Sequence, residues 1–134
     1  MANEATIIEL FNGGRPIRYT VADGAGIEKG TLMQLSSDPR TITASSGDGE
    51  IFVGVAAAEK VASDGSTTLA VYTDGIFDIT DSGAGITLGN MAKLNGANLI
   101  AASDEAGAQA CIEWVGQVLE TTAANEVVAV RVNK

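Results

Sequence analysis

Residues 26–35 read GIEKGTLMQL, and residues 85–94 read GITLGNMAKL, the same pattern 59 positions further along the chain. The same spacing carries the apolar run at residues 69–73 onto residues 128–132. A motif that recurs with its flanking pattern indicates an internal duplication. The sequence therefore predicts one small domain that is built from two related halves.

Both halves have the composition of β-structure. Short runs rich in Val, Ile and Thr are separated by turns such as Asp74-Gly75 and Asn95-Gly96. Strands favour these side chains, and Asp-Gly and Asn-Gly turns supply the positive φ angles of tight hairpins. Stretches of helix-forming residues are short. We expect an all-β fold, a small β-barrel or β-tulip-like domain with related halves at about residues 26–79 and 85–132.

The first twenty residues differ from the rest. A β-like run at residues 6–11 is broken by Asn12-Gly13-Gly14, and the segment after it is extended because the residue before Pro16 avoids helix. Two interpretations stay open, an N-terminal arm or a first strand of the barrel. As an arm, residues 1–20 would precede a single barrel-like domain at residues 21–134.

Composition excludes several classes of function. The chain has 134 residues, a formal net charge of −9 and no histidine, and Cys111 is its one cysteine. An acidic surface disfavours nucleic acid and anionic membranes. Without histidine the chain lacks the usual general base near neutral pH, and one cysteine cannot form an internal disulfide. With no signal-like N-terminus or long apolar run, we expect a cytoplasmic product with no membrane contact.

No motif for catalysis, cofactor binding or metal binding stands up to inspection. The glycines at residues 24–30 lead into a strand, whereas a phosphate loop needs a helix N-terminus. The acidic residues Asp74, Asp78 and Asp81, like the pair Asp48 and Glu50, lack the spacing of a calcium loop and are expected to be solvated turn residues. We therefore expect no enzyme activity and no catalytic, cofactor or metal residues. The larger aromatics are expected in the core or at a subunit contact: Phe11, Phe52, Tyr72, Phe77 and Trp114.

The order of these features resembles a known family. A Pro-Ile-Arg-Tyr segment comes first, then a Gly-Ile-x-x-Gly turn, then the apolar run at residues 52–56. The run at residues 69–79 precedes a second Gly-Ile-x-x-Gly turn, and strands at residues 115–118 and 127–132 close the chain. This pattern over residues 15–134 is similar to the small capsid decoration, or cement, proteins of tailed bacteriophages with an HK97-type capsid.

The resemblance implies a structural virion protein with an extended N-terminal arm. Such proteins sit as homotrimers on the outer surface of the expanded capsid, at three-fold and quasi-three-fold positions, and bind the major capsid protein. The candidate contact residues are the segment Arg15, Pro16, Ile17, Arg18 and Tyr19 of the expected arm, chosen because Arg15, Arg18 and Tyr19 are polar or aromatic residues in an otherwise acidic chain. Two other hypotheses remain, another phage structural module (tail tube, head completion or fibre base) and a small ligand- or carbohydrate-binding β-domain.

Overall fold

The computed structural model describes residues 3–10, 15–48, 50–83, 85–103 and 112–134. These parts of the chain form an all-β structure, as the sequence predicts. The strands are β1 (Thr6–Leu10), β2 (Ile17–Thr20), β3 (Leu32–Leu35), β4 (Ile42–Ala44), β5 (Phe52–Ala56), β6 (Thr68–Tyr72), β7 (Asp74–Asp81), β8 (Met91–Leu94), β9 (Leu99–Ala102), β10 (Trp114–Val118) and β11 (Val127–Asn133).

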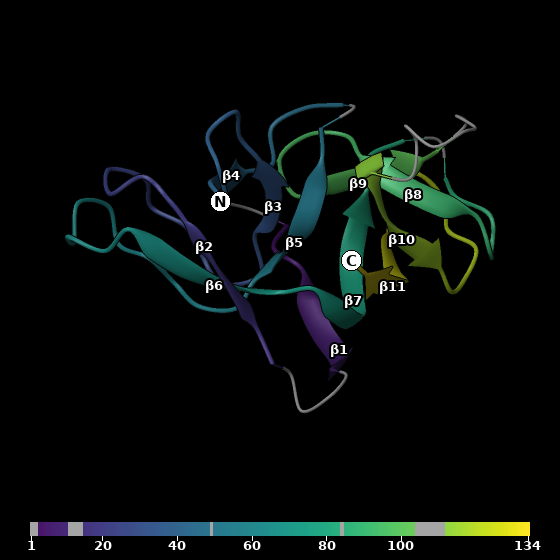
Figure 1. Ribbon diagram of the computed structural model, residues 1–134. Helices are drawn as coiled ribbons and strands as arrows, with labels where there is room; N and C mark the ends of the chain where they lie inside the picture. Colours follow the sequence, from purple (N-terminus) through teal and green to yellow (C-terminus); the bar gives the residue numbers. More distant parts are fainter. Residues whose placement is uncertain (1–2, 11–14, 49, 84, 104–111) are drawn as a thin grey trace.

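The strands form two sheets that lie side by side (Figure 1). The second sheet runs β1-β7-β11-β10-β8-β9, and its last five strands, here called the C-terminal barrel, close because β9 also pairs with β7. This closing contact is parallel and joins Thr80 to Leu99 and Asp81 to Ile100. Closure leaves the barrel without free edges, which removes a common route to unwanted strand pairing.

The first sheet, here called the N-terminal sheet, runs β2-β6-β5-β3-β4. The strand order matches that of the barrel: each strand of the N-terminal sheet comes five strands earlier in the chain than the barrel strand at the same place. Its two edge strands also approach each other, through one parallel bridge between Thr20 and Thr41. The N-terminal sheet is therefore a second, barely closed copy of the barrel topology.

Strand register is matched between the two copies as well. In each copy, the fourth strand along the chain has a β-bulge that is followed by a glycine. This glycine is Gly54 in β5 and Gly116 in β10. The matched partners across β3–β5 and β8–β10 are Leu32–Val55 with Met91–Gln117, Met33–Gly54 with Ala92–Gly116, and Gln34–Phe52 with Lys93–Trp114. The duplication predicted from the sequence is thus present in the hydrogen bonds of the sheets.

The glycines of the repeated motif hold equivalent turns. Gly30 has φ of 91° and Gly89 has φ of 88°, in the left-handed region that glycine enters without strain. The Gly30 N–H donates to the Ala56 carbonyl, and the Gly89 N–H donates to the Val118 carbonyl, both at 2.9 Å. Each motif therefore turns the chain into the next strand and fastens that turn to the same neighbouring strand.

Each copy has its own apolar interior. Burial in β7 alternates strictly, with Phe77 and Ile79 inside the barrel, as expected for strands with one buried face. All five residues of β5 are buried, because both faces of that strand are covered. Val53 and Ala56 point into the N-terminal sheet, whereas Phe52 and Val55 pack with the core of the barrel.

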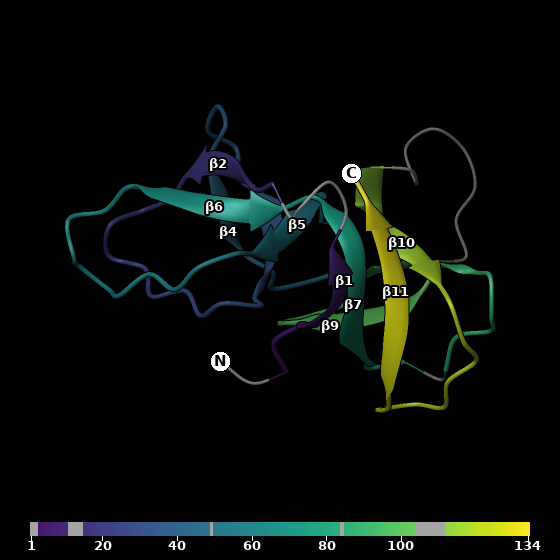
Figure 2. The same ribbon diagram turned by 90° about the horizontal axis from the view of Figure 1, so that it is seen from below.

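The extended N-terminal arm expected over residues 1–20 is not confirmed. Residues 6–10 form β1, which pairs antiparallel with β7 and lies along its outer edge (Figure 2). Residues 17–20 form β2, paired with β6 inside the N-terminal sheet. The first strand of the N-terminal sheet begins at Ile17, and the first strand of the barrel begins at Asp74.

Candidate functional site

The five candidate contact residues lie on and just before β2. Arg15, Pro16, Ile17 and Arg18 are exposed, and Tyr19 is half-buried against the core of the N-terminal sheet. The structure therefore brings two guanidinium groups to the surface of an acidic chain, along one short strand.

The outer edge of β2 is poorly suited to adding a further strand. The Thr20 N–H donates to the Arg40 carbonyl at 2.9 Å, and Arg40 Nη2 donates to the Arg18 carbonyl at 3.0 Å. Backbone groups two residues apart face the same side of a strand, so Pro16 should offer an N–H at this edge but has none. Proline and a capping side chain are devices that protect sheet edges. Contacts made by this segment therefore depend on its side chains.

The acidic residue at the end of β7 has a structural role. Asp81, expected to be a solvated turn residue, is fully buried. Its carboxylate accepts the N–H of Gly83 at 2.9 Å and the N–H of Gly85 at 3.0 Å. Backbone donors satisfy the buried charge, so the carboxylate is used in holding the turn.

Other carboxylates make ion pairs between parts of the fold. Asp48 lies 3.1 Å from Lys93 Nζ and so links the N-terminal sheet to β8 of the barrel. Asp74 pairs with Arg131 across the β7–β11 ladder. Among the described residues, no group of three or more histidine, cysteine, aspartate or glutamate side chains could hold a metal ion.

A buried lysine holds the loop between β5 and β6. Lys60 Nζ donates to the Asp23 carbonyl at 2.6 Å and to Asp64 Oδ1 at 3.1 Å. The N–H of Ser66, with the Lys60 ammonium as a second cause, lowers the pKa of Asp64 below its ordinary value. Lys60 therefore has a structural role, because its ammonium group holds this loop in place.

The glycine-rich loop at residues 24–30 is occupied by the protein's own backbone. The Ala5 N–H donates to the Gly30 carbonyl at 2.6 Å, and a Cβ at Gly30 would lie 2.5 Å from the Ala5 carbonyl oxygen. A strand follows the loop, as expected, so the helix N-terminus of a phosphate site is missing there.

The aromatic side chains divide between the core and the surface. Phe52 and Phe77 are buried, and the ring of Tyr72 lies 6.2 Å from that of Phe77 between centroids. Trp114 is only half-buried, and its indole N–H donates to Ser103 Oγ at 2.9 Å. Phe11 and Cys111 lie outside the described residues. Trp114 is thus available for a contact, as is the half-buried Tyr19.

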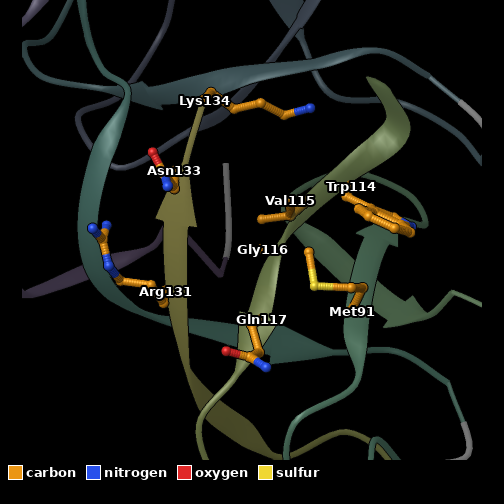
Figure 3. Close-up of a pocket in the computed structure, with 8 residues that line it drawn as sticks. All are labelled: Met91, Trp114, Val115, Gly116, Gln117, Arg131, Asn133 and Lys134. Atoms are coloured by element: carbon orange, nitrogen blue, oxygen red, sulfur yellow. The ribbon is translucent and has the colours of Figure 1, made fainter. Parts of the chain in front are cut away.

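Trp114 lines a shallow hollow of about 360 Å³ on the outside of the barrel (Figure 3). Met91 lies beside Trp114, while Arg131 and Asn133 of β11 lie across the hollow from them. Sequence reasoning singled out Trp114 alone here, because the outward positions of β8 and β11 become neighbours only once the barrel register is known. The lining side chains hold no base or nucleophile arranged for catalysis.

The comparisons with known proteins give the family. The family model for the phage cement protein matches residues 11–133. The chain belongs to this family. No curated protein matches the chain.

Membership makes the chain a structural, capsid-associated protein of a bacteriophage. Cement proteins are a non-enzymatic kind of protein, in agreement with the expectation that this chain is not an enzyme. Within the described residues, no helix is long and apolar enough to cross a bilayer. The surfaces of interest are therefore the exposed part of β2 and the hollow at Trp114.

Proposed function

We propose that this protein decorates the outer surface of an expanded icosahedral capsid and stabilises it by bridging neighbouring copies of the major capsid protein. The family match over residues 11–133 is the observation that carries this proposal. A net charge of −9 supports the outer position, because an acidic protein is repelled by the packaged nucleic acid inside.

We further propose that Arg15, Pro16, Ile17, Arg18 and Tyr19 contact the capsid protein. The first four are exposed, and the two guanidinium groups suit carboxylates on a partner. The blocked edge of β2 favours contact through these side chains over addition of a backbone strand. In this form the proposal replaces an extended arm with a surface segment of the folded sheet.

The proposed assembly is a homotrimer at three-fold and quasi-three-fold positions. Closed symmetry of this kind limits growth, which suits a protein that covers a shell without linking particles to one another. Light scattering of the free protein should give the mass of a trimer, or of a monomer that trimerises only on the shell. A stable dimer would count against this assembly.

A particle-binding experiment tests the function. Purified protein is mixed with expanded particles that lack it, and the sedimented fraction is measured together with the temperature at which the particles open. Decoration predicts saturable binding and a higher opening temperature. Protein that stays in the supernatant, or that binds without any change in opening temperature, would contradict the proposal.

The matched variants are Arg15→Glu/Arg18→Glu and, as a control, Lys29→Glu, which changes one exposed basic residue away from β2. The double variant should lower the affinity at least about tenfold, since it reverses charges at the proposed contact. The control should bind like the unaltered protein. Equal binding by all three proteins would remove β2 from the contact and leave the wider function standing.

A further inference from the structure

Two copies of one topology within a chain allow each surface to be compared with its counterpart. The N-terminal sheet has an outer face formed by four side chains: Leu32, Phe52, Val55 and Tyr72. By strand register their counterparts on the C-terminal barrel are Met91, Trp114, Gln117 and Arg131. These four residues form the outer face of the barrel and line the hollow at Trp114 (Figure 3).

The outer face of the N-terminal sheet is covered. Leu32, Phe52 and Val55 are buried in one cluster with the interior residues of the barrel, and Tyr72 packs on the same cluster. A hydrogen bond adds to this packing: the Leu32 N–H donates to Asn98 Oδ1 at 2.8 Å. This face therefore packs on the core of the barrel.

The outer face of the barrel has no such cover in the part of the chain that the structure describes. Gln117 is exposed, and Met91 and Trp114 are half-buried, although their counterparts Val55, Leu32 and Phe52 are buried. Trp, Met and Arg are enriched at the centres of protein interfaces. Among the described residues, no carboxylate side chain lines the hollow, and that of Asp74, next to it, is paired with Arg131. A second copy of this acidic protein could therefore approach this face without direct repulsion.

A matching surface is also exposed. The side of the barrel that receives the N-terminal sheet includes Phe77, whose exposed fraction is 0%. Its counterpart in the N-terminal sheet is Ile17, because Ile17 pairs with Val71 as Phe77 pairs with Val130. Ile17 is 43% exposed. Ile17, together with Tyr19 and Leu35, which are half-buried against the core of the N-terminal sheet, is here called the open rim.

We propose that the open rim of one copy docks on the outer face of the barrel of a second copy, repeating between chains the contact that joins the two sheets within a chain. The contact is head-to-tail, so it closes into a ring or continues as a fibre. The inference rests on the proposed function only for the place of assembly, the particle surface. Because Ile17 would then lie between copies, capsid contact by β2 would fall to Arg15 and Arg18.

Cross-linking of two mixed single variants tests the docking. Within one chain, the ring of Tyr72 contacts the ring of Phe77. Arg131 is the counterpart of Tyr72 and Ile17 is the counterpart of Phe77, so the proposed docking places Arg131 of one copy near Ile17 of the next. Gln117 is the cross-strand partner of Arg131, and its side chain is exposed. Ile17→Cys and Gln117→Cys are therefore made separately in a Cys111→Ser background, mixed, and treated with a short bis-maleimide, both in solution and bound to particles. Mass spectrometry then identifies the joined peptides.

The proposal expects a peptide joining positions 17 and 117 in the mixture, and no peptide joining identical positions in either variant alone. Absence of the 17–117 peptide from both solution and particles would overturn it, as would a 17–17 or 117–117 product. Sedimentation with particles is measured on the same samples. Cross-linking without particle binding would support the docking and contradict the proposed function. Particle binding without cross-linking would support the proposed function and contradict the docking.

A charge substitution gives a second readout. Gln117→Arg should lower the association constant between copies at least about tenfold, because it adds a second guanidinium beside Arg131 where the Arg15 and Arg18 side chains flanking Ile17 of the next copy would approach. The matched control is Leu88→Arg, at a site 60% exposed in the loop between β7 and β8. This control should associate normally. Equal association of both variants would contradict the assigned face.

Discussion

The N-terminal sheet and the C-terminal barrel share strand order and register, yet they differ in how fully they are closed. Two parallel residue pairs close the barrel, whereas one bridge joins the edges of the sheet. β1 covers the edge of β7, but the corresponding edge of β2 carries Pro16 and the capping side chain of Arg40. The same topology thus yields a closed core in one copy and an open rim in the other, according to what lies beside it.

The largest effect is expected where equivalent positions have different surroundings. Phe52→Ala should destabilise the protein by about 3–5 kcal/mol, because Phe52 is buried between the two sheets. Trp114→Ala removes the counterpart on the uncovered face and should reduce stability by about 1–2 kcal/mol. Urea unfolding of the protein at low concentration measures both. Equal losses would mean that the two faces are equally covered.

A smaller effect is expected where the two copies have the same surroundings. A Cβ at Gly54 would lie 2.3 Å from the Tyr72 carbonyl oxygen, and one at Gly116 would lie 2.1 Å from the Arg131 carbonyl oxygen. Gly54→Ala and Gly116→Ala should therefore each reduce stability by about 1–3 kcal/mol. In Gly24→Ala, the control, the new methyl group meets no atom within 4 Å. If only one of the bulge glycines tolerates alanine, the equivalence of the bulges fails.

The loops before β6 and β11 are held by different side chains at matched places. Lys60 and Thr122 pair with Ile27 and Ile86 of the two repeated motifs. Lys60→Met keeps the apolar stem, loses the donors to Asp23 and Asp64, and should reduce stability by about 1–2 kcal/mol. Thr122→Val loses one hydroxyl donor and should reduce it by at most about 1 kcal/mol. Thermal unfolding followed by circular dichroism compares them, and a larger loss in Thr122→Val would reverse the ranking.

The smallest effect concerns pH. The pKa of Asp64 is lowered in the folded state, first by the Ser66 N–H and then by Lys60. Its contribution to stability is therefore complete above the unfolded pKa of about 4 and is lost as pH falls through the folded value. Asp64→Asn should be less stable than the unaltered protein at pH 6, and the difference should shrink towards pH 2. A difference that stays constant over this range would contradict the assignment.

Much of the fold was predictable because its signals are local. The repeated Gly-Ile-x-x-Gly motif marks turns at Gly30 and Gly89 that only glycine enters easily, and β7 and β11 alternate in burial. The start of each copy was not predictable. IRYT at residues 17–20 and FDIT at residues 77–80 share few side chains, so only strand pairing reveals that β2 and β7 are equivalent.

The surfaces were harder to predict than the strands. Trp114 stood out by its residue type, but Met91, Gln117 and Arg131 became its neighbours through pairing between distant strands. The burial of Asp81 could not be foreseen, because its donors at Gly83 and Gly85 depend on the path of the turn. Long-range register therefore carries the information about this face that single residues lack.

The central claim, that this cement protein covers a capsid as a decoration layer, is tested most directly by its copy number in purified particles. Quantitative mass spectrometry against the major capsid protein gives this ratio. The account predicts a ratio near one to one. A ratio tenfold lower or less would contradict it and assign the chain to the tail or the portal end of the particle.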